Sequence, residues 1–123
     1  MPKKEIKKKT VKNRLDKLWG LLVHKKERCE VCGKSDGLNA HHIIGRRRLS
    51  TRWDLRNSCL LCAKHHLFGN DSAHQNAIWF DEWLENNRPE DREYLKEKSR
   101  EASKPYSVKE LLEIEEKLKE LNT

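Results

Sequence analysis

The amino-acid sequence predicts a small α+β fold in which a central region is flanked by two amphipathic helices. Three observations lead to this prediction. The chain has 123 residues, of which 35% are apolar and 38% charged, so its hydrophobic core is thin. Two short apolar segments, residues 38–44 and 55–61, have the length of strands. Apolar residues recur at near-helical spacing in the first and last parts of the chain.

The first amphipathic helix is expected over residues 6–24. Its apolar positions, separated by lysines, are Ile6, Val11, Leu15, Leu18 and Leu22. Residues 1–5 lack this pattern and are expected to be disordered. The helix belongs to a basic N-terminal extension, residues 1–28, in which eleven Lys and Arg stand against three acidic residues, a net charge of +8. Such a field attracts polyanions, although a solvated basic tail would have the same composition.

The central region, residues 29–88, contains all four cysteines and five of the six histidines. Cys29 and Cys32 form a Cys-x-x-Cys pair in the segment CEVCGKSDGL, whose two glycines suit tight turns. Because the chain has no apolar signal segment, a metal site is favoured over disulfides, and we expect an intracellular, cytoplasmic protein. No run of about 18 apolar residues is present, so no membrane-spanning segment is expected.

The second half of the metal site has two interpretations. Cys59 and Cys62 have the same separation as the Cys29 and Cys32 pair, and so do Cys62 and His65. Since neighbouring strand residues face opposite sides, Cys62 at a strand end and His65 in the next turn can converge on one ion. Cys59 is then a buried apolar residue. We therefore expect a structural zinc ion bound by Cys29, Cys32, Cys62 and His65, with a four-cysteine site as the first alternative and no bound metal as the second. Zinc binding would also stabilise a fold with a thin core.

Four polar residues are left unexplained by this zinc site: His41, His42, Asn57 and His66. Their order and spacing, together with the flanking Cys pairs, resemble the HNH endonucleases of the zinc-stapled phage and bacterial type. The resemblance covers residues 29–83. It implies a ββα-metal (His-Me finger) core and metal-dependent hydrolysis of DNA, leaving 5′-phosphate and 3′-hydroxyl ends, in a bacterium or a phage-infected host.

The resemblance also implies a role for each residue by its position. His42 is the general base that takes a proton from the attacking water. His41 and His66 are ligands of a catalytic divalent cation, which is Mg²⁺, Mn²⁺, Ni²⁺ or Zn²⁺. Asn57 fixes the loop and orients the base histidine through its backbone carbonyl. Because neighbours on a strand face opposite sides, His41 and His42 can serve one site only at a strand edge or a strand end.

The candidates for a third ligand of the catalytic ion are His74 and Asn70, and the remaining alternative is that no third protein ligand exists. In a straight helix His74 would lie about 12 Å along the axis from His66, which is too far to share an ion. A turn at Gly69 would bring His74 back to the site, and imidazole binds transition metals better than an amide does. We therefore favour His74.

The loop between His42 and Asn57 is strongly basic. Its arginines, whose guanidinium groups match phosphate oxygens, are Arg46, Arg47, Arg48 and Arg52. We expect them to bind DNA, with a solvated loop as the alternative. Trp53 is expected in the core rather than on a base.

The remaining chain is expected to be helical. Ser72 and Gln75 match a capping box before an apolar helix. Residues 89–123 form a charged C-terminal extension, in which residues 89–104 are a helix or linker. From Ser107 an amphipathic helix is expected, which packs on the first helix or offers a surface to a protein partner or a second copy.

Three classes of function fit these features: a DNA endonuclease, a non-catalytic zinc-stabilised module that binds nucleic acid, and a structural zinc protein that binds other proteins. The first is favoured, because a pure zinc module has no use for the additional histidines and Asn57. Residues 75–123 carry a net charge of −4 and are expected to lie away from the DNA.

Overall fold

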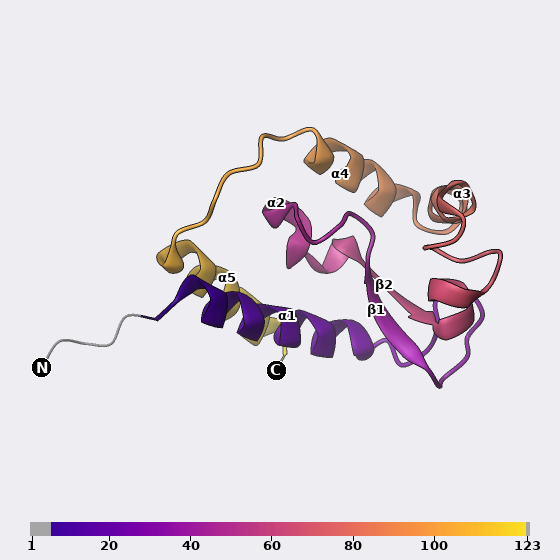
Figure 1. Ribbon diagram of the computed structural model, residues 1–123, viewed down its shortest axis with the longest axis horizontal. Helices are drawn as coiled ribbons and strands as arrows, with labels where there is room; N and C mark the ends of the chain where they lie inside the picture. Colours follow the sequence, from indigo (N-terminus) through magenta and orange to yellow (C-terminus); the bar gives the residue numbers. More distant parts are fainter. Residues whose placement is uncertain (1–5, 123) are drawn as a thin grey trace, which may run out of the picture.

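The computed structural model describes residues 6–122 and has a small α+β architecture (Figure 1). The expectation of disorder for residues 1–5 lies outside this range. The elements in chain order are α1 (Lys8–His24), β1 (Leu38–His42), α2 (Leu49–Arg52), the 3₁₀ turn η1 (Leu55–Asn57), β2 (Ser58–Cys62), the π-helix η2 (Lys64–Phe68), α3 (Ala77–Asn87), α4 (Pro89–Ser99) and α5 (Val108–Leu121).

Helix α1 confirms the expected N-terminal helix and buries one apolar stripe. Its buried residues, which follow the helical repeat, are Val11, Leu15, Trp19, Leu22 and Val23. Ile6 was expected at the start of this helix but precedes it and is exposed. Helix α5 lies alongside α1 (Figure 1), and the Arg14 guanidinium donates two hydrogen bonds to the Glu115 carboxylate across the contact. The expected packing of the last helix on the first is therefore confirmed.

The two strands form an antiparallel hairpin in the expected region, but both are shorter than predicted. Leu38 pairs with Cys62 at one end and His42 with Ser58 at the other. The segment after His42 leaves the ladder because the Asn57 side chain, rather than a strand, binds the backbone of Ile44. Residues 55–57, expected to be extended, instead form η1.

The connections around the hairpin follow local turn chemistry. Gly33 and Gly37 both have positive φ angles, of 77° and 62°, which explains why glycine occupies these turns. Residues 45–54 were predicted to be a loop but include the single turn α2, with Thr51 buried. A single helical turn is too short to show a periodic pattern of apolar residues, so the sequence could not predict it.

The segment after β2 differs from prediction in two details. A short helix is present here as the π-helix η2, which ends before Gly69. Ser72 was predicted as the N-cap of the following helix. Instead α3 is capped by Asn76, whose side chain accepts a hydrogen bond from the Trp79 N–H. Ser72 accepts from the Gln75 N–H in the preceding turn, and the Gln75 side chain donates to the Leu67 carbonyl.

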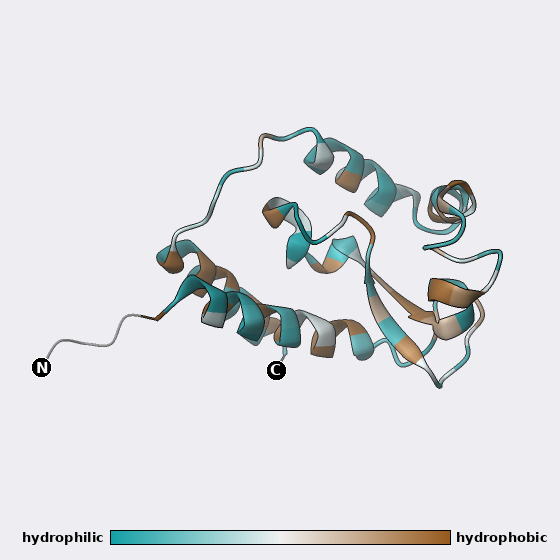
Figure 2. Ribbon diagram, viewed as in Figure 1, coloured by the Kyte–Doolittle hydropathy of each residue, from teal (hydrophilic) through white to brown (hydrophobic). Residues whose placement is uncertain are grey.

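The buried side chains form two clusters on either side of the hairpin. One joins α1 and α5 to Trp53 and Leu60, and the other joins Cys59 and Leu61 to α3. Helices α1 and α5 show mixed hydropathy around their circumference, whereas β2 is apolar (Figure 2). The hairpin therefore presents β2 to the core and carries polar residues, including His41 and His42, on β1.

Candidate functional site

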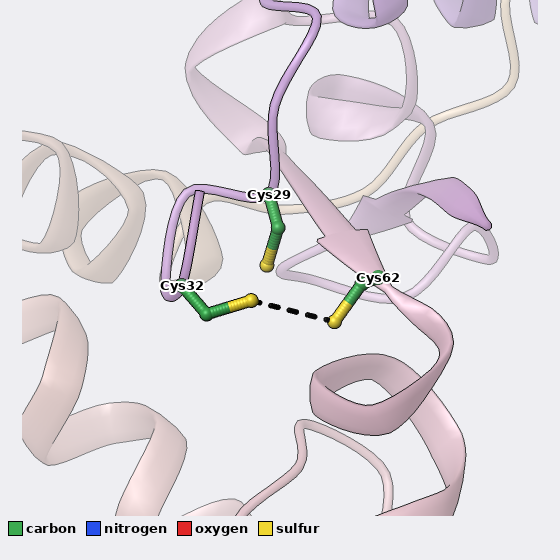
Figure 3. A group of neighbouring side chains, drawn as sticks. All are labelled: Cys29, Cys32 and Cys62. Carbon is green, nitrogen blue, oxygen red and sulfur yellow. Dashed lines mark hydrogen bonds between the residues drawn. The ribbon is translucent and has the colours of Figure 1, made fainter. Parts of the chain in front are cut away.

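Three cysteines converge beside the end of the hairpin (Figure 3). The sulfur atoms of Cys29, Cys32 and Cys62 all lie within 4.8 Å of one another and could hold a metal ion. The Cys32 and Cys62 sulfurs are 3.7 Å apart. Two thiolates bound to one tetrahedral zinc at about 2.3 Å would be separated by about 3.8 Å. The spacing of this group, named here the cysteine group, therefore fits such an ion.

The backbone around Cys29 favours its thiolate form. Burial, the largest influence, would raise the pKa of the Cys29 thiol. Hydrogen bonds from the backbone N–H groups of Cys62, Cys32 and Val31 outweigh it and bring the pKa below its ordinary value. A thiolate is the form that binds a metal, so the turn prepares Cys29 as a ligand.

The structure does not bring the expected fourth ligand, His65, into the cysteine group. Its Nδ1 lies 3.0 Å from the Asp71 carbonyl oxygen, and its ring stacks on Trp79 with 5.9 Å between the ring centroids. The loop after η2 folds back over His65, an effect that the Cys-x-x-His spacing could not reveal. Cys59 is also outside the group. It is fully buried, and burial raises the pKa of its thiol. Cys59 is thus a core residue, as the preferred interpretation expected.

Three histidines form a second group, named here the histidine group. His41 on β1, His66 on η2 and His74 before α3 place ring nitrogens within 4.8 Å of one another, and they too could hold a metal ion. The Nε2 atoms of His66 and His74 are 3.2 Å apart. Two imidazoles bound to one ion at about 2.0–2.1 Å would have nitrogens about 3.3 Å apart. The three residues predicted to bind a second ion are therefore brought together.

The chain turn that completes the histidine group follows η2. The π-helix ends at Gly69, whose N–H donates to the Lys64 carbonyl. The backbone then folds back so that the His74 N–H donates to the His66 carbonyl at 3.1 Å. This turn brings His74 to the group, as expected, while Asn70 is exposed.

The surroundings of His41 and His66 favour the neutral forms of their imidazoles. Burial, followed by repulsion from His66, His74 and His42, lowers the pKa of His41 to about 3. Burial and then His74 lower the pKa of His66. The Nδ1 of His66 is buried and has no hydrogen-bond partner among the described residues. Neutral rings keep a nitrogen lone pair available at neutral pH, as metal binding requires.

His42 lies at the end of β1 and turns its ring away from the histidine group. The ring stacks on Trp19 of α1, with centroids 3.8 Å apart and planes 8° apart. Its Nε2 is 2.8 Å from the carbonyl oxygen of Arg52. A carbonyl only accepts hydrogen bonds, so we assign the proton to Nε2, which leaves the Nδ1 lone pair free. Burial, the largest influence, lowers the pKa of His42, so the neutral ring is favoured.

Asn57 fixes the loop that follows His42. It is fully buried. Its Oδ1 accepts from the Ile44 N–H at 2.6 Å, and its Nδ2 donates to the carbonyls of Ile44 and Thr51 at 2.9 and 3.0 Å. The carbonyl that binds His42 belongs to Arg52 and not to Asn57 itself. Asn57 therefore acts on His42 indirectly, by holding the residue before Arg52.

Two of the four loop arginines are held by a residue that sequence reasoning missed. Asp16 of α1 accepts hydrogen bonds from Arg46, Arg52 and Trp53. Burial, the largest influence, raises the pKa of Asp16, but the hydrogen bonds from Arg52 and Trp53 outweigh it, and the pKa is lowered. Asp16 is the only acidic residue of α1, which was the available signal.

The other two arginines differ in their surroundings. Arg48 donates to the Glu101 carbonyl, whereas Arg47 is exposed and makes no hydrogen bond or ion pair with another described residue. Trp53 is buried, as expected. The basic loop is thus partly neutralised, with Arg47 and the outer side of Arg46 open to an anion.

In comparisons with known proteins, this chain matches no protein family, no curated protein and no solved structure. Between residues 6 and 122, no helix has the length and apolar character needed to cross a membrane. The function must therefore be argued from the geometry of the two ligand groups and of His42.

Proposed function

We propose that the chain is a metal-dependent HNH endonuclease that hydrolyses phosphodiester bonds of DNA. The observation that carries this proposal is the convergence of His41, His66 and His74 near the end of β1, where His42 is the next residue after His41. The order of hairpin and short helix, β1, β2 and η2, supports a ββα-metal core. A purely structural metal protein would need only the cysteine group.

Each ligand group suits a different ion. The cysteine group offers three sulfur ligands at tetrahedral spacing, which suits a structural zinc ion whose binding energy stabilises the fold. The histidine group offers three imidazoles, which suit Zn²⁺ or Ni²⁺ better than Mg²⁺ or Mn²⁺. A divalent ion held there supplies Lewis-acid stabilisation of the charge on the phosphate and on the leaving oxygen.

His42 is the proposed general base. Its Nε2–H is held by the Arg52 carbonyl, so Nδ1 is the atom that accepts the proton of the attacking water. The water oxygen forms a bond to phosphorus, the bond from phosphorus to the 3′ oxygen breaks, and that oxygen takes a proton from solvent. The products are a 5′-phosphate and a 3′-hydroxyl. Arg47 and Arg46 lie on the loop that follows His42 and are suited to contact the flanking phosphates.

A nicking assay tests this proposal. Purified protein is incubated with supercoiled plasmid and Mg²⁺, Mn²⁺, Ni²⁺ or Zn²⁺, and the nicking rate and the affinity for DNA are measured separately. We expect His42→Ala to lower the rate by about 10²–10⁴-fold and to leave the affinity unchanged. His24→Ala is the matched control, because His24 is an exposed histidine at the end of α1. Undiminished nicking by His42→Ala would exclude His42 as the base.

One observation favours a second candidate, a zinc-stabilised module that binds nucleic acid without cleaving it. The His42 ring faces Trp19 rather than the histidine group, as a purely structural histidine would. This candidate predicts DNA binding without nicking under any of the four ions. In either case the affinity should fall steeply with added salt, because the contacts are with phosphates.

A further inference from the structure

We infer that helix α1 is part of the catalytic apparatus, and that Trp19 and Asp16 are positioning residues for His42. This inference rests on the proposed nuclease function. The two residues are three positions apart and therefore lie on the same face of α1. From that face Trp19 contacts the His42 ring, and Asp16 holds the chain segment that supplies the hydrogen-bond partner of His42.

Trp19 restrains the plane of the His42 ring. The two rings are almost parallel, at 8°, with 3.8 Å between centroids. The indole is itself immobile, because it is only 3% exposed and its Nε1–H donates to the Asp54 carbonyl at 3.1 Å. The stacking contact leaves open the rotation of the ring by about 180° about its Cβ–Cγ bond, which keeps the ring plane and exchanges the positions of the ring nitrogens.

Asp16 restrains that remaining rotation through the backbone. Its carboxylate accepts from Nε and Nη2 of Arg52 at 3.1 and 2.8 Å, from Nε1 of Trp53 at 2.9 Å, and from Nη2 of Arg46 at 2.9 Å. Arg52 and Trp53 are thereby held against α1. The Arg52 carbonyl then points at His42 Nε2 and fixes Nδ1 as the free nitrogen. Stacking and hydrogen bonding together define a single orientation of the base.

The hydrogen bonds of Asp16 weaken the electrostatic attraction of DNA, a disadvantage that a purely structural contact would not require. A carboxylate on a helix with five Lys and Arg neutralises arginines that would otherwise attract the DNA. A displacement of a reacting group by about 1 Å can lower the reaction rate about 10²-fold. The gain in rate from an oriented base therefore offsets the weaker attraction of DNA. The effect of these residues should therefore lie on the rate of cleavage rather than on DNA binding.

Kinetics of the metal-loaded protein test the inference. We expect Trp19→Leu to lower kcat for plasmid nicking by about 10–100-fold while KM is unchanged, and Trp19→Phe to restore most of kcat because it keeps an aromatic face. Leu15→Ala is the matched control, since Leu15 is a fully buried residue of the same helix and core cluster. An equal loss of kcat in Leu15→Ala, or an unchanged kcat in Trp19→Leu, would overturn the inference.

Asp16→Asn tests the second residue. The amide keeps the shape of the carboxylate but accepts fewer hydrogen bonds and pairs with no arginine. We expect kcat to fall, whereas KM stays the same or decreases because Arg46 is released toward the DNA. Asp81→Asn is the control, because Asp81 also binds an arginine, Arg92, but lies on α3. A rise of KM alone in Asp16→Asn would contradict a positioning role.

A spectroscopic arm separates this inference from the proposed function. Nuclear magnetic resonance of the wild type should show cross-relaxation between the Trp19 and His42 rings and a single His42 tautomer with the proton on Nε2. Trp19→Leu and Asp16→Asn should both give a mixture of tautomers. If these signatures appear but His42→Ala still cleaves DNA, the nuclease mechanism fails and the restraint stands. If His42→Ala is inactive but the tautomer is unaffected by both substitutions, only the inference fails.

Discussion

At the scale of single residues, Asn57 shows how one buried amide organises the loop between the two halves of the site. All three hydrogen bonds of its side chain go to backbone groups of residues 44 and 51. The importance of this asparagine could be expected from the resemblance of the motif. The hydrogen-bond partners of Asn57 could not be predicted, because hydrogen bonds to irregular backbone produce no repeating residue pattern in a sequence.

The first prediction concerns the stability that Asn57 provides. Asn57→Ala leaves the N–H and carbonyl of Ile44 without their partner inside the protein, whereas the Thr51 carbonyl keeps the hydrogen bond from the Asp54 N–H. We expect the free energy of unfolding to fall by about 2–4 kcal/mol, measured by urea denaturation of the zinc-loaded protein. Asn70→Ala, at an exposed asparagine, should change it by less than about 0.5 kcal/mol. A similar effect of both substitutions would show that the hydrogen bonds of Asn57 do not stabilise the loop.

At the scale of secondary-structure elements, the sequence predicted the elements that have a periodic pattern of apolar residues and missed those that have none. Helices α1 and α5 follow from apolar spacing over several turns, and the hairpin follows from two short apolar segments. The turn α2 and the cap of α3 at Asn76 depend on single hydrogen bonds, so no pattern reveals them. The same reason explains which parts of the candidate site could be predicted. The histidine group was predicted from the resemblance of the motif and from the expected turn at Gly69, whereas the contacts of Trp19 and Asp16 with the loop arise only from tertiary packing.

The second prediction concerns the turn that ends η2. A Cβ atom at Gly69 would lie 2.7 Å from the Lys64 carbonyl oxygen, which is too close for the backbone to remain in place. Gly69→Ala should therefore move the chain between His66 and His74 and weaken metal binding at the histidine group. Calorimetric titration with Zn²⁺, after the cysteine group has been saturated, measures this loss. Gly45→Ala is the control, because nothing lies within 4 Å of its Cβ position. Equal affinities in the two variants would contradict the assigned role of the turn.

At the scale of the whole molecule, the flanking helices and the hairpin share one core. Leu60 of β2 packs in the same cluster as α1 and α5, so the N-terminal helix supports the hairpin rather than extending away from it. Charge is distributed unevenly along the sequence, with +8 on residues 1–28 and −4 on residues 75–123. Under the proposed function, this charge would direct DNA to the side of α1 and the arginine loop, and the His42 ring also contacts α1.

The third prediction is that the molecule binds two ions with different consequences for the fold. The cysteine group joins the turn after α1 to the end of β2, so removing one ligand should unfold a protein whose core is thin. The histidine group lies at the surface of an already folded hairpin. We expect elemental analysis to find two zinc equivalents in the wild type. His66→Ala should retain one equivalent and the native circular dichroism spectrum, whereas Cys62→Ser should lose that spectrum.

Cys59→Ala is the control that distinguishes the two cysteine interpretations. Cys59 is fully buried and lies outside the cysteine group, so its substitution removes one small apolar contact and no ligand. It should therefore keep two zinc equivalents and unfold at a urea concentration only slightly below that of the wild type. Loss of one equivalent in Cys59→Ala would mean that Cys59 is the fourth ligand of the structural ion. A Cys62→Ser protein that unfolds at the same urea concentration as the wild type would mean that the cysteine group contributes nothing to the fold, because a ligand that binds the native state alone must lower stability when its site is removed.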